Sequence, residues 1–159
     1  MELEIVVEIP RGSRNKYEID DKTGAIWLDR MLFTATRYPT DYGYIPETLA
    51  EDGDPLDALV LVEDPTFPGC HIRVRPLGLF WMQDEAGPDA KVLTVPVSDP
   101  RWTGIDDLDG VPPFMLQEIE HFFEIYKALE PGKSTNTGGW QGRAEAERVI
   151  GESRDRYKD

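Results

Sequence analysis

The amino-acid sequence predicts an α+β fold in which a small β-barrel comes first and two C-terminal helices flank it. Residues 3–95 contain many short apolar or alternating runs punctuated by glycine and proline, a pattern typical of small barrels. Beyond residue 113 the apolar positions are spaced three and four residues apart, as in amphipathic helices. A length of 159 residues suits one domain with its own core, so we expect residues 1–159 to form a single domain.

Seven segments are predicted to be strands because they are apolar or alternating and are bounded by turn-forming residues. They are Leu3–Ile9, Tyr17–Ile19, Ala25–Leu28, Ala58–Val62, His71–Arg75, Leu79–Met82 and Lys91–Val95. Pro10 ends the first strand, and the turn Asp20–Gly24 joins the second and third into a hairpin. Pro76 and Gly78 interrupt the pattern, so the fifth and sixth segments are expected to be separate.

The C-terminal part of the sequence predicts two helices. Apolar side chains recur at helical spacing from Phe114 to Leu129, where Pro113 suits the first turn and Pro131–Gly132 ends the helix. A second helix is predicted from about Arg143 to Tyr157, a stretch rich in alanine, glutamate and arginine.

The overall charge excludes several classes of protein. The net charge of −14 argues against nucleic-acid binding, which needs a basic face, and against binding to anionic membranes. No apolar stretch is long enough to span a bilayer, and the first residues do not form a signal peptide. The single cysteine, Cys70, excludes internal disulfides, so we expect a cytoplasmic protein. The four tryptophans are expected to be packing residues.

Residues 51–57 are the most informative part of the sequence, since they place three aspartates on one short turn. Gly53 and Pro55 shape the turn, and a predicted buried strand follows at once. The carboxylates of Asp52, Asp54 and Asp57 would repel one another unless solvent or a cation screened them. Hard oxygen ligands at the end of a firm strand suit Mg²⁺ or Mn²⁺.

Two other interpretations of this segment were considered. A solvated acidic loop is one, because the chain has 31 Asp and Glu residues and acidic clusters arise by chance. An EF-hand loop beginning at Asp52 is the other. It is rejected because Leu56 occupies a ligand position and Asp57 stands where the loop requires glycine.

A second acidic group lies between Asp84 and Asp89, at the turn between two predicted strands, with Lys91 close behind. Alone it is a solvated turn, but beside the first group it could complete a site for several divalent ions. Lysine, arginine and tyrosine residues recur around both groups, so a polyanion that arrives with metal ions could bind. Two adjacent metals can generate hydroxide from water at neutral pH, and a free aspartate can accept the remaining proton. These features indicate phosphoryl transfer to water.

The residues that carry this chemistry resemble those of the soluble family I inorganic pyrophosphatases of the prokaryotic type. The segment Asp52–Ala58 is similar to the signature of that family. Shorter similar stretches follow the same order along almost the whole chain: Val7–Pro10, Lys16–Glu18, Asp29–Arg30, Tyr38–Pro39, Tyr42–Pro46, Arg75–Gly78, Asp84–Glu85, His121–Phe123 and Tyr126–Lys127. The final helix matches least specifically.

The resemblance implies a five-stranded barrel like that of oligonucleotide-binding domains, and Mg²⁺-dependent hydrolysis of pyrophosphate to two phosphates by metal-activated water. It implies several Mg²⁺ ions per subunit, with Mn²⁺ or Zn²⁺ as possible substitutes, and a homohexamer whose contacts partly involve the helix from Phe114 to Leu129. The implied metal ligands are Glu8, Asp52, Asp57, Asp84 and Asp89. The implied substrate-binding residues are Lys16, Glu18, Arg30, Tyr42, Lys91, Tyr126 and Lys127. Asp54 or Asp89 would be the general base, and the sequence does not choose between them.

Three alternatives to a pyrophosphatase stay open at this point. The chain could be a non-catalytic module that binds divalent ions, or a barrel whose acidic loops bind a basic partner. A different metal-dependent phosphohydrolase is the nearest enzymatic alternative. Two residues also have interpretations without a role in the site. Tyr126 lies on the apolar stripe of its helix and would be at least partly a core residue, and Lys127 could be an ordinary solvated lysine. Glu130 to Lys133 are expected to form an exposed turn.

Overall fold

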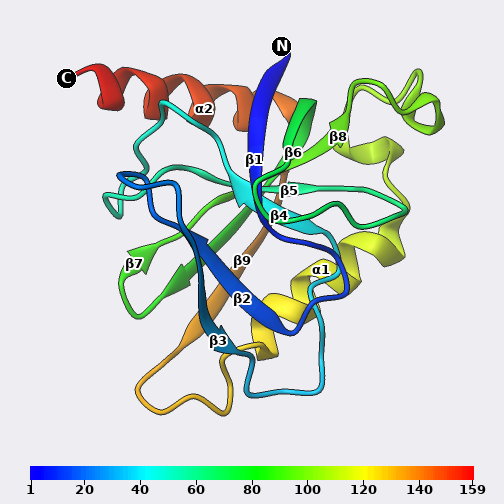
Figure 1. Ribbon diagram of the computed structural model, residues 1–159. Helices are drawn as coiled ribbons and strands as arrows, with labels where there is room; N and C mark the ends of the chain where they lie inside the picture. The colour runs from blue at the N-terminus through cyan, green and yellow to red at the C-terminus, as the bar shows by residue number, and fades with distance from the viewer.

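A ring of five paired strands forms the centre of the molecule in the computed structural model, which describes residues 1–159 (Figure 1). The pairing order is β1–β4–β5–β8–β6, and β6 pairs with β1 again. The strands are β1 (Leu3–Ile9), β4 (Asp41–Tyr44), β5 (Asp57–Val60), β8 (Lys91–Pro96) and β6 (His71–Asp84). All pairings in the ring are antiparallel except β5 with β8. The sheet is therefore mixed, and β5 and β8 run side by side in the same direction.

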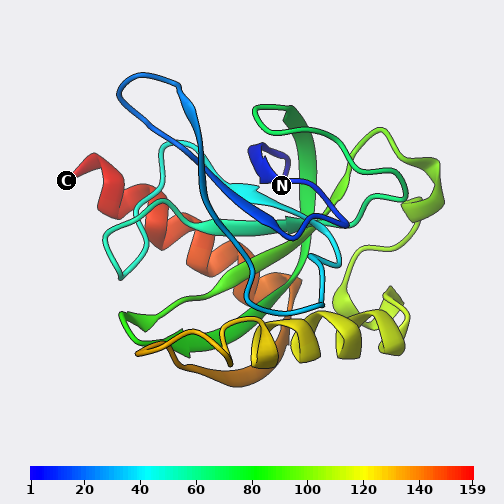
Figure 2. The same cartoon turned by 60° about the horizontal axis from the view of Figure 1, so that its bottom comes forward.

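The other elements surround this ring. They are the hairpin β2 (Asn15–Ile19) and β3 (Ile26–Met31), the short β7 (Gly87–Pro88), β9 (Thr135–Gly142), the 3₁₀ turns Pro100–Trp102 and Leu108–Gly110, and the helices α1 (Pro113–Ile125) and α2 (Arg143–Lys158). The β2–β3 hairpin is a separate two-stranded sheet. Figure 2 shows it projecting from the ring on the side opposite α1. No helix has the length and apolar character needed to cross a membrane.

Two hydrophobic clusters, one under each helix, hold the ring together. The larger contains Phe122 and Phe123 of α1, and the smaller contains Val149 and Ile150 of α2. Neighbouring residues of β5 belong to different clusters: Leu59 packs in the α1 cluster, whereas Ala58 and Val60 pack in the α2 cluster. Because a strand is buried on both faces here, its sequence is continuously apolar rather than alternating.

Most predicted elements are present, and the departures have physical causes. The two segments expected on either side of Pro76 and Gly78 form one strand, β6, whose register against β8 shifts at those residues. A bulge therefore accommodates the proline inside a continuous strand. The first helix is also shorter than expected: it ends at Ile125, so Leu129 lies outside it.

Three strands were not predicted: the two-residue β7, and β4 and β9, whose sequences contain glycine and polar residues. Gly43 shows why β4 needs glycine: a Cβ there would lie 2.0 Å from the carbonyl oxygen of Val6 on β1. β9 is stabilised by its pairing along β6 rather than by its own sequence. The expectation that all four tryptophans pack is wrong for Trp27, which lies on β3 with 64% of its surface exposed.

Candidate active site

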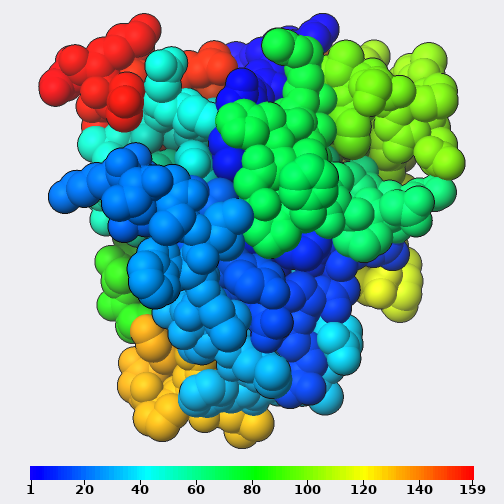
Figure 3. Space-filling model, in the orientation of Figure 1, coloured from blue at the N-terminus to red at the C-terminus, as the bar shows by residue number.

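The acidic residues singled out in the sequence come together in one cleft of about 390 Å³. The β2–β3 hairpin forms one wall, and Figure 3 shows it in blue across the surface of the molecule. The end of β1, the strand β4, the loop before β5, the turn after β6 and the residues after α1 form the rest. Eight carboxylate side chains line the cleft: Glu8, Glu18, Asp21, Asp52, Asp54, Asp57, Asp84 and Asp89.

Backbone hydrogen bonds shape the loop that carries Asp52 and Asp54. The Asp54 amide donates to Asp52 Oδ1 at 3.0 Å, and the Ala50 amide donates to the Asp54 carbonyl at 2.7 Å. Gly53 lies at φ 89°, a conformation that glycine adopts without strain. The sequence Asp-Gly-Asp-Pro therefore builds a tight turn that places two carboxylates at the mouth of the cleft.

Lys91 forms the floor of the cleft and is only 1% exposed. Asp57 and Lys91 are register partners on the parallel strands β5 and β8, which brings their side chains together. The Lys91 ammonium donates to Asp57 Oδ2 and Asp89 Oδ2 at 3.1 Å each, and to the Tyr42 hydroxyl at 2.8 Å. Tyr42 in turn donates to Asp57 at 2.8 Å. Burial alone would lower the pKa of Lys91, but Asp57 and Asp89 outweigh it and hold that pKa above its ordinary value.

The carboxylates of the cleft carry more negative charge than the nearby side chains neutralise. Burial raises the pKa of Glu8 to about 7, although an amide hydrogen bond from Ile19 opposes the shift. Burial also raises the pKa of Asp52 and of Asp89. The Asp54 amide opposes the first shift and the Lys91 ammonium opposes the second, whereas the neighbouring carboxylates of Asp54 and Asp57 add to them. A bound cation would favour the charged form of each of these carboxylates.

Two further lysines lie at the rim of the cleft. Lys127 follows α1 and is 8% exposed, so it is not the solvated lysine of the alternative interpretation. Its ammonium lies 3.5 Å from Asp84 Oδ2 and 3.3 Å from Glu85 Oε2. Lys16 on β2 contacts Glu18 Oε1 at 2.9 Å. Both ammonium groups face the carboxylates, and both can meet the negative charge of an anion that enters the cleft.

Arg30 lies beside the cleft rather than in its lining. It is the register partner of Lys16 on the hairpin and forms ion pairs with Asp29 and Glu130. The Arg30 Nε atom lies 2.8 Å from Glu130 Oε1, and Nη2 donates to Oε2 at 3.3 Å. Glu130 is buried, with 4% of its side chain exposed, so the exposed turn expected at residues 130–133 is wrong at its first residue.

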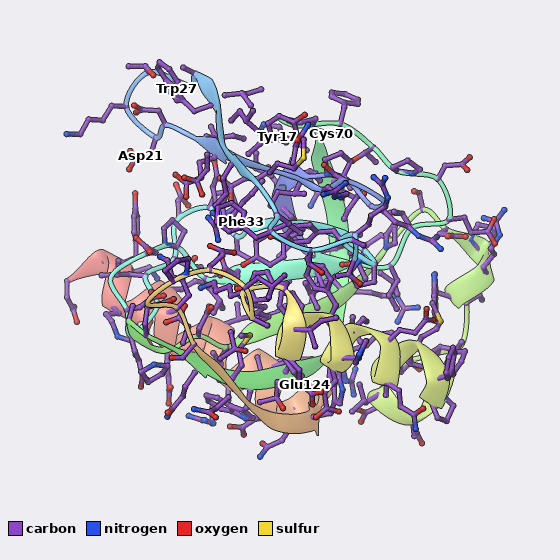
Figure 4. All side chains as sticks on the ribbon, turned by 90° about the horizontal axis from the view of Figure 1, so that it is seen from below. Tyr17, Asp21, Trp27, Phe33, Cys70 and Glu124 are labelled. Atoms are coloured by element: carbon purple, nitrogen blue, oxygen red, sulfur yellow. The ribbon has the colours of Figure 1, made fainter.

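The structure thus gathers eleven of the thirteen predicted site residues in the lining of one cleft: Glu8, Lys16, Glu18, Tyr42, Asp52, Asp54, Asp57, Asp84, Asp89, Tyr126 and Lys127. Lys91 lies beneath them, and Arg30 lies alongside. Sequence reasoning missed Tyr17, Asp21 and Tyr44 in the lining. Figure 4 labels Tyr17 and Asp21, which both come from the hairpin. The sequence also contained no indication of the role of Glu130, because no local pattern connects it with Arg30, 100 residues away.

The donor set of the cleft fits a hard divalent cation. All its candidate ligands are carboxylate oxygens, and no histidine or cysteine lines the cleft, which suits Mg²⁺ or Mn²⁺ better than a soft metal. Lys91 contacts both Asp57 and Asp89, Lys127 contacts Asp84, and no three of the carboxylates form a tight metal cluster. The residues fit the metal in the chemistry of their donor atoms.

A ring of strands with an acidic cleft, a lysine buried beneath it and lysines at its rim is the arrangement expected of a hydrolase that acts on phosphate-containing anions. The family model described as inorganic pyrophosphatase matches residues 5–158. An inorganic pyrophosphatase of Streptomyces coelicolor is 58% identical over 159 residues, covering 100% of this chain and 98% of that protein. One from Corynebacterium glutamicum is 54% identical over 158 residues, covering 99% of both chains. The crystal structure of the inorganic pyrophosphatase of Thermus thermophilus superposes with a TM-score of 0.97 at 51% identity, covering 99% of this chain and 92% of that one.

The chain belongs to the inorganic pyrophosphatase family. The family that the sequence resembles and the predicted enzyme class, an inorganic diphosphatase, are thereby confirmed. The two non-enzymatic alternatives considered for the sequence are set aside by the same comparison.

Proposed function

We propose that this protein hydrolyses inorganic pyrophosphate to two orthophosphates in a Mg²⁺-dependent reaction, with water as the attacking nucleophile. The observation that carries the proposal is the single cleft in which eleven predicted residues meet. Pyrophosphate is small and highly charged, so a site for it needs more cationic charge than Lys16 and Lys127 provide. Bound divalent cations supply the remainder, and the excess of carboxylates holds them.

Asp52, Asp57 and Asp89 are proposed to hold the first Mg²⁺ ion, and Asp57 is proposed to share the second. Asp84 and Asp89 are proposed to hold a further ion that accompanies the substrate, and Glu8 to bind water or another ion. When bound, Mg²⁺ would lower the pKa of water in the cleft and offset the charge of the two phosphate groups. Mn²⁺ or Zn²⁺ could replace it, although the all-oxygen donor set favours Mg²⁺.

The protein's own residues orient the substrate and move the proton. Lys16 reaches the cleft from β2, and Tyr126 and Lys127 reach it from the end of α1, so phosphate oxygens can be bound from two sides. Arg30 is proposed to join them by turning toward the cleft from its place beside Lys16. Lys91 and Tyr42 hold the Asp57 carboxylate in one orientation through hydrogen bonds of 3.1 and 2.8 Å.

Asp54 is the better candidate for the general base. It lines the cleft but makes no ion pair with a lysine, whereas Asp89 accepts a hydrogen bond from Lys91. A carboxylate free of a cationic partner can accept a proton from attacking water without first breaking an ion pair. Asp89 is correspondingly better suited to the role of ligand.

A phosphate-release assay tests the proposal. Purified protein stripped with EDTA should release little phosphate from pyrophosphate, and added Mg²⁺ should restore the reaction. Nucleoside triphosphates and polyphosphate serve as competing substrates, and release from them at a comparable rate would indicate a broader phosphohydrolase. Pyrophosphate cleavage that is equally fast without metal would overturn the metal-dependent reaction.

We also propose a cytoplasmic homohexamer with a barrel like that of oligonucleotide-binding domains. The closed ring of pairings supports the barrel. Assembly is supported by exposed apolar side chains on two elements: Phe114 on α1 is 68% exposed, and four residues of β3 are at least 47% exposed. β3 therefore joins the expected helix as a candidate contact surface. Light scattering should give a mass near six times 18.1 kDa, and a stable monomer would contradict the assembly.

A further inference from the structure

The C-terminal helix α2 holds the base of the acidic loop through the backbone of one residue. The Leu49 amide donates to the Ser153 carbonyl at 2.9 Å, and the Leu49 carbonyl accepts from Arg156 Nη1 at 2.6 Å. Both polar groups of the Leu49 backbone are therefore bound to the last turns of α2. Leu49 lies three positions before Asp52, directly at the entry to the loop.

The rest of the loop has few other anchors. Residues 51–55 are exposed, and the hydroxyl of the buried Thr48 fixes the ends by donating to the Ile45 carbonyl and accepting from the Leu56 amide. A cavity of about 120 Å³ separates the loop from α2, and it is lined in part by Ala50, Leu56 and Arg156. Leu56 and Ala50 pack in the cluster under α2 at the base of the loop, whereas residues 51–55 are exposed. The hydrogen bonds to Leu49 therefore act beside this packing to set the direction in which the loop leaves α2.

We propose that Arg156 is a positioning residue for the reaction: its hydrogen bond to the Leu49 carbonyl fixes the loop that presents Asp52 and Asp54 to the cleft. The assignment of Asp52 as a metal ligand rests on the proposed function. The fixing of the loop does not, because it concerns hydrogen bonds present without metal or substrate.

The hydrogen bond from Arg156 to Leu49 should affect only the part of the site that lies on the loop of Asp52 and Asp54. Lys16 comes from the hairpin, and Lys127 follows α1, so neither depends on the Leu49 anchor. Only the carboxylates of the acidic loop move when the anchor is lost. A displacement of about 1 Å of catalytic groups can cost on the order of 10²-fold in rate. Loss of Arg156 should therefore weaken metal binding and turnover, and leave the affinity for pyrophosphate nearly unchanged.

The test compares Arg156→Met with Arg154→Met. Both residues lie in the last turns of α2, so both changes remove the same charge near the same helix end. The Arg154 side chain makes no hydrogen bond or ion pair, whereas that of Arg156 donates to Leu49. Three quantities are measured: amide hydrogen exchange at Gly53 and Asp54 without metal, the Mg²⁺ dissociation constant by calorimetry, and kcat and KM for pyrophosphate at saturating Mg²⁺.

For Arg156→Met we expect amide exchange in the loop to rise about tenfold and the Mg²⁺ dissociation constant to rise about five- to tenfold. We expect kcat to fall about tenfold, with KM within about twofold of the wild type. Arg154→Met should match the wild type in all three. Arg156→Lys, whose ammonium can reach the same carbonyl, should recover part of the loss.

Loop exchange and Mg²⁺ affinity equal to those of Arg154→Met would overturn the proposal. So would a variant that only melts at a lower temperature, because that is the signature of a general packing role. If Arg156→Met does not fold, Arg156→Gln is measured in its place against the same two outcomes. A wild-type protein that cleaves no pyrophosphate would refute the proposed function, while amide exchange would still test the anchor.

Discussion

Replacing Lys91 with methionine removes the one cation buried between Asp57 and Asp89 and keeps a side chain of similar length. The ammonium is 1% exposed and lies 3.1 Å from an oxygen of each carboxylate. Removing one partner of a buried ion pair typically costs about 3–5 kcal/mol, because the remaining charge is left unpaired. Asp57 keeps 25% of its side chain exposed and Asp89 keeps 11%, so solvent relieves part of the penalty and we expect about 3 kcal/mol.

This loss should be visible in thermal unfolding without metal. In a domain of this length about 1 kcal/mol shifts the melting temperature by roughly 2–4 °C, so Lys91→Met should melt about 6–12 °C below the wild type in EDTA at pH 7. The folded-state pKa of Lys91 is raised, so its contribution is complete below its ordinary pKa of 10.5 and is lost only as pH rises beyond the raised value. The contribution is therefore fully present at pH 7.

The pH dependence identifies the cause. Burial raises the pKa of Asp89, so protonation of that carboxylate should shrink the difference between variant and wild type as the pH falls into the acid range. Added Mg²⁺ should also reduce it, because a bound dication replaces the missing positive charge. Equal melting temperatures in EDTA at pH 7, or a difference that stays constant from pH 4 to 8, would refute the ion-pair account.

Three other predictions concern carboxylates of the site. The pKa of Glu8 is about 7 in the folded protein and 4.5 ordinarily, so the folded state holds this proton more tightly than the unfolded state does. The free energy of unfolding of the metal-free protein should therefore fall by up to about 3 kcal/mol as the pH rises from about 4.5 to 7. Glu8→Gln should abolish this slope in melting experiments, and an unchanged slope would contradict the assignment. Asp57→Asn should weaken both Mg²⁺ binding and turnover, whereas Asp54→Asn should lower turnover about 10²–10⁴-fold with little change in calorimetric Mg²⁺ affinity. If Asp54→Asn lost as much Mg²⁺ affinity as Asp57→Asn, Asp54 would be a metal ligand and not the general base. Glu130→Gln should lower KM for pyrophosphate about tenfold, because it releases Arg30 to turn toward the cleft, and an unchanged KM would exclude that role.

Local patterns predicted the parts of the fold that depend on local physics. Alternation and turn residues identified β1 and the β2–β3 hairpin, helical spacing identified α1, and a composition rich in alanine, glutamate and arginine identified α2. β9 was missed because its residues carry no apolar pattern, and it exists only through pairing with β6. Trp27 was misassigned for a related reason: a large aromatic residue usually packs inside, but β3 lies on a hairpin that projects from the ring.

The candidate site was predicted well where its residues cluster in the sequence and poorly where they do not. The turn containing Asp52 and Asp57 can be recognised in the sequence from its glycine, its proline and its repeated carboxylates. The contacts between Glu130 and Arg30, and between Arg156 and Leu49, join residues about 100 positions apart. Only the tertiary fold creates such pairs, so a single sequence holds no signal for them.

The central claim is that this acidic cleft hydrolyses pyrophosphate with the help of Mg²⁺. The most direct measurement is the rate of phosphate release from pyrophosphate by the EDTA-stripped protein, before and after a titration with Mg²⁺. The account predicts almost no release without metal and full recovery on titration. Release at the full rate in EDTA, or no release at any Mg²⁺ concentration, would contradict it.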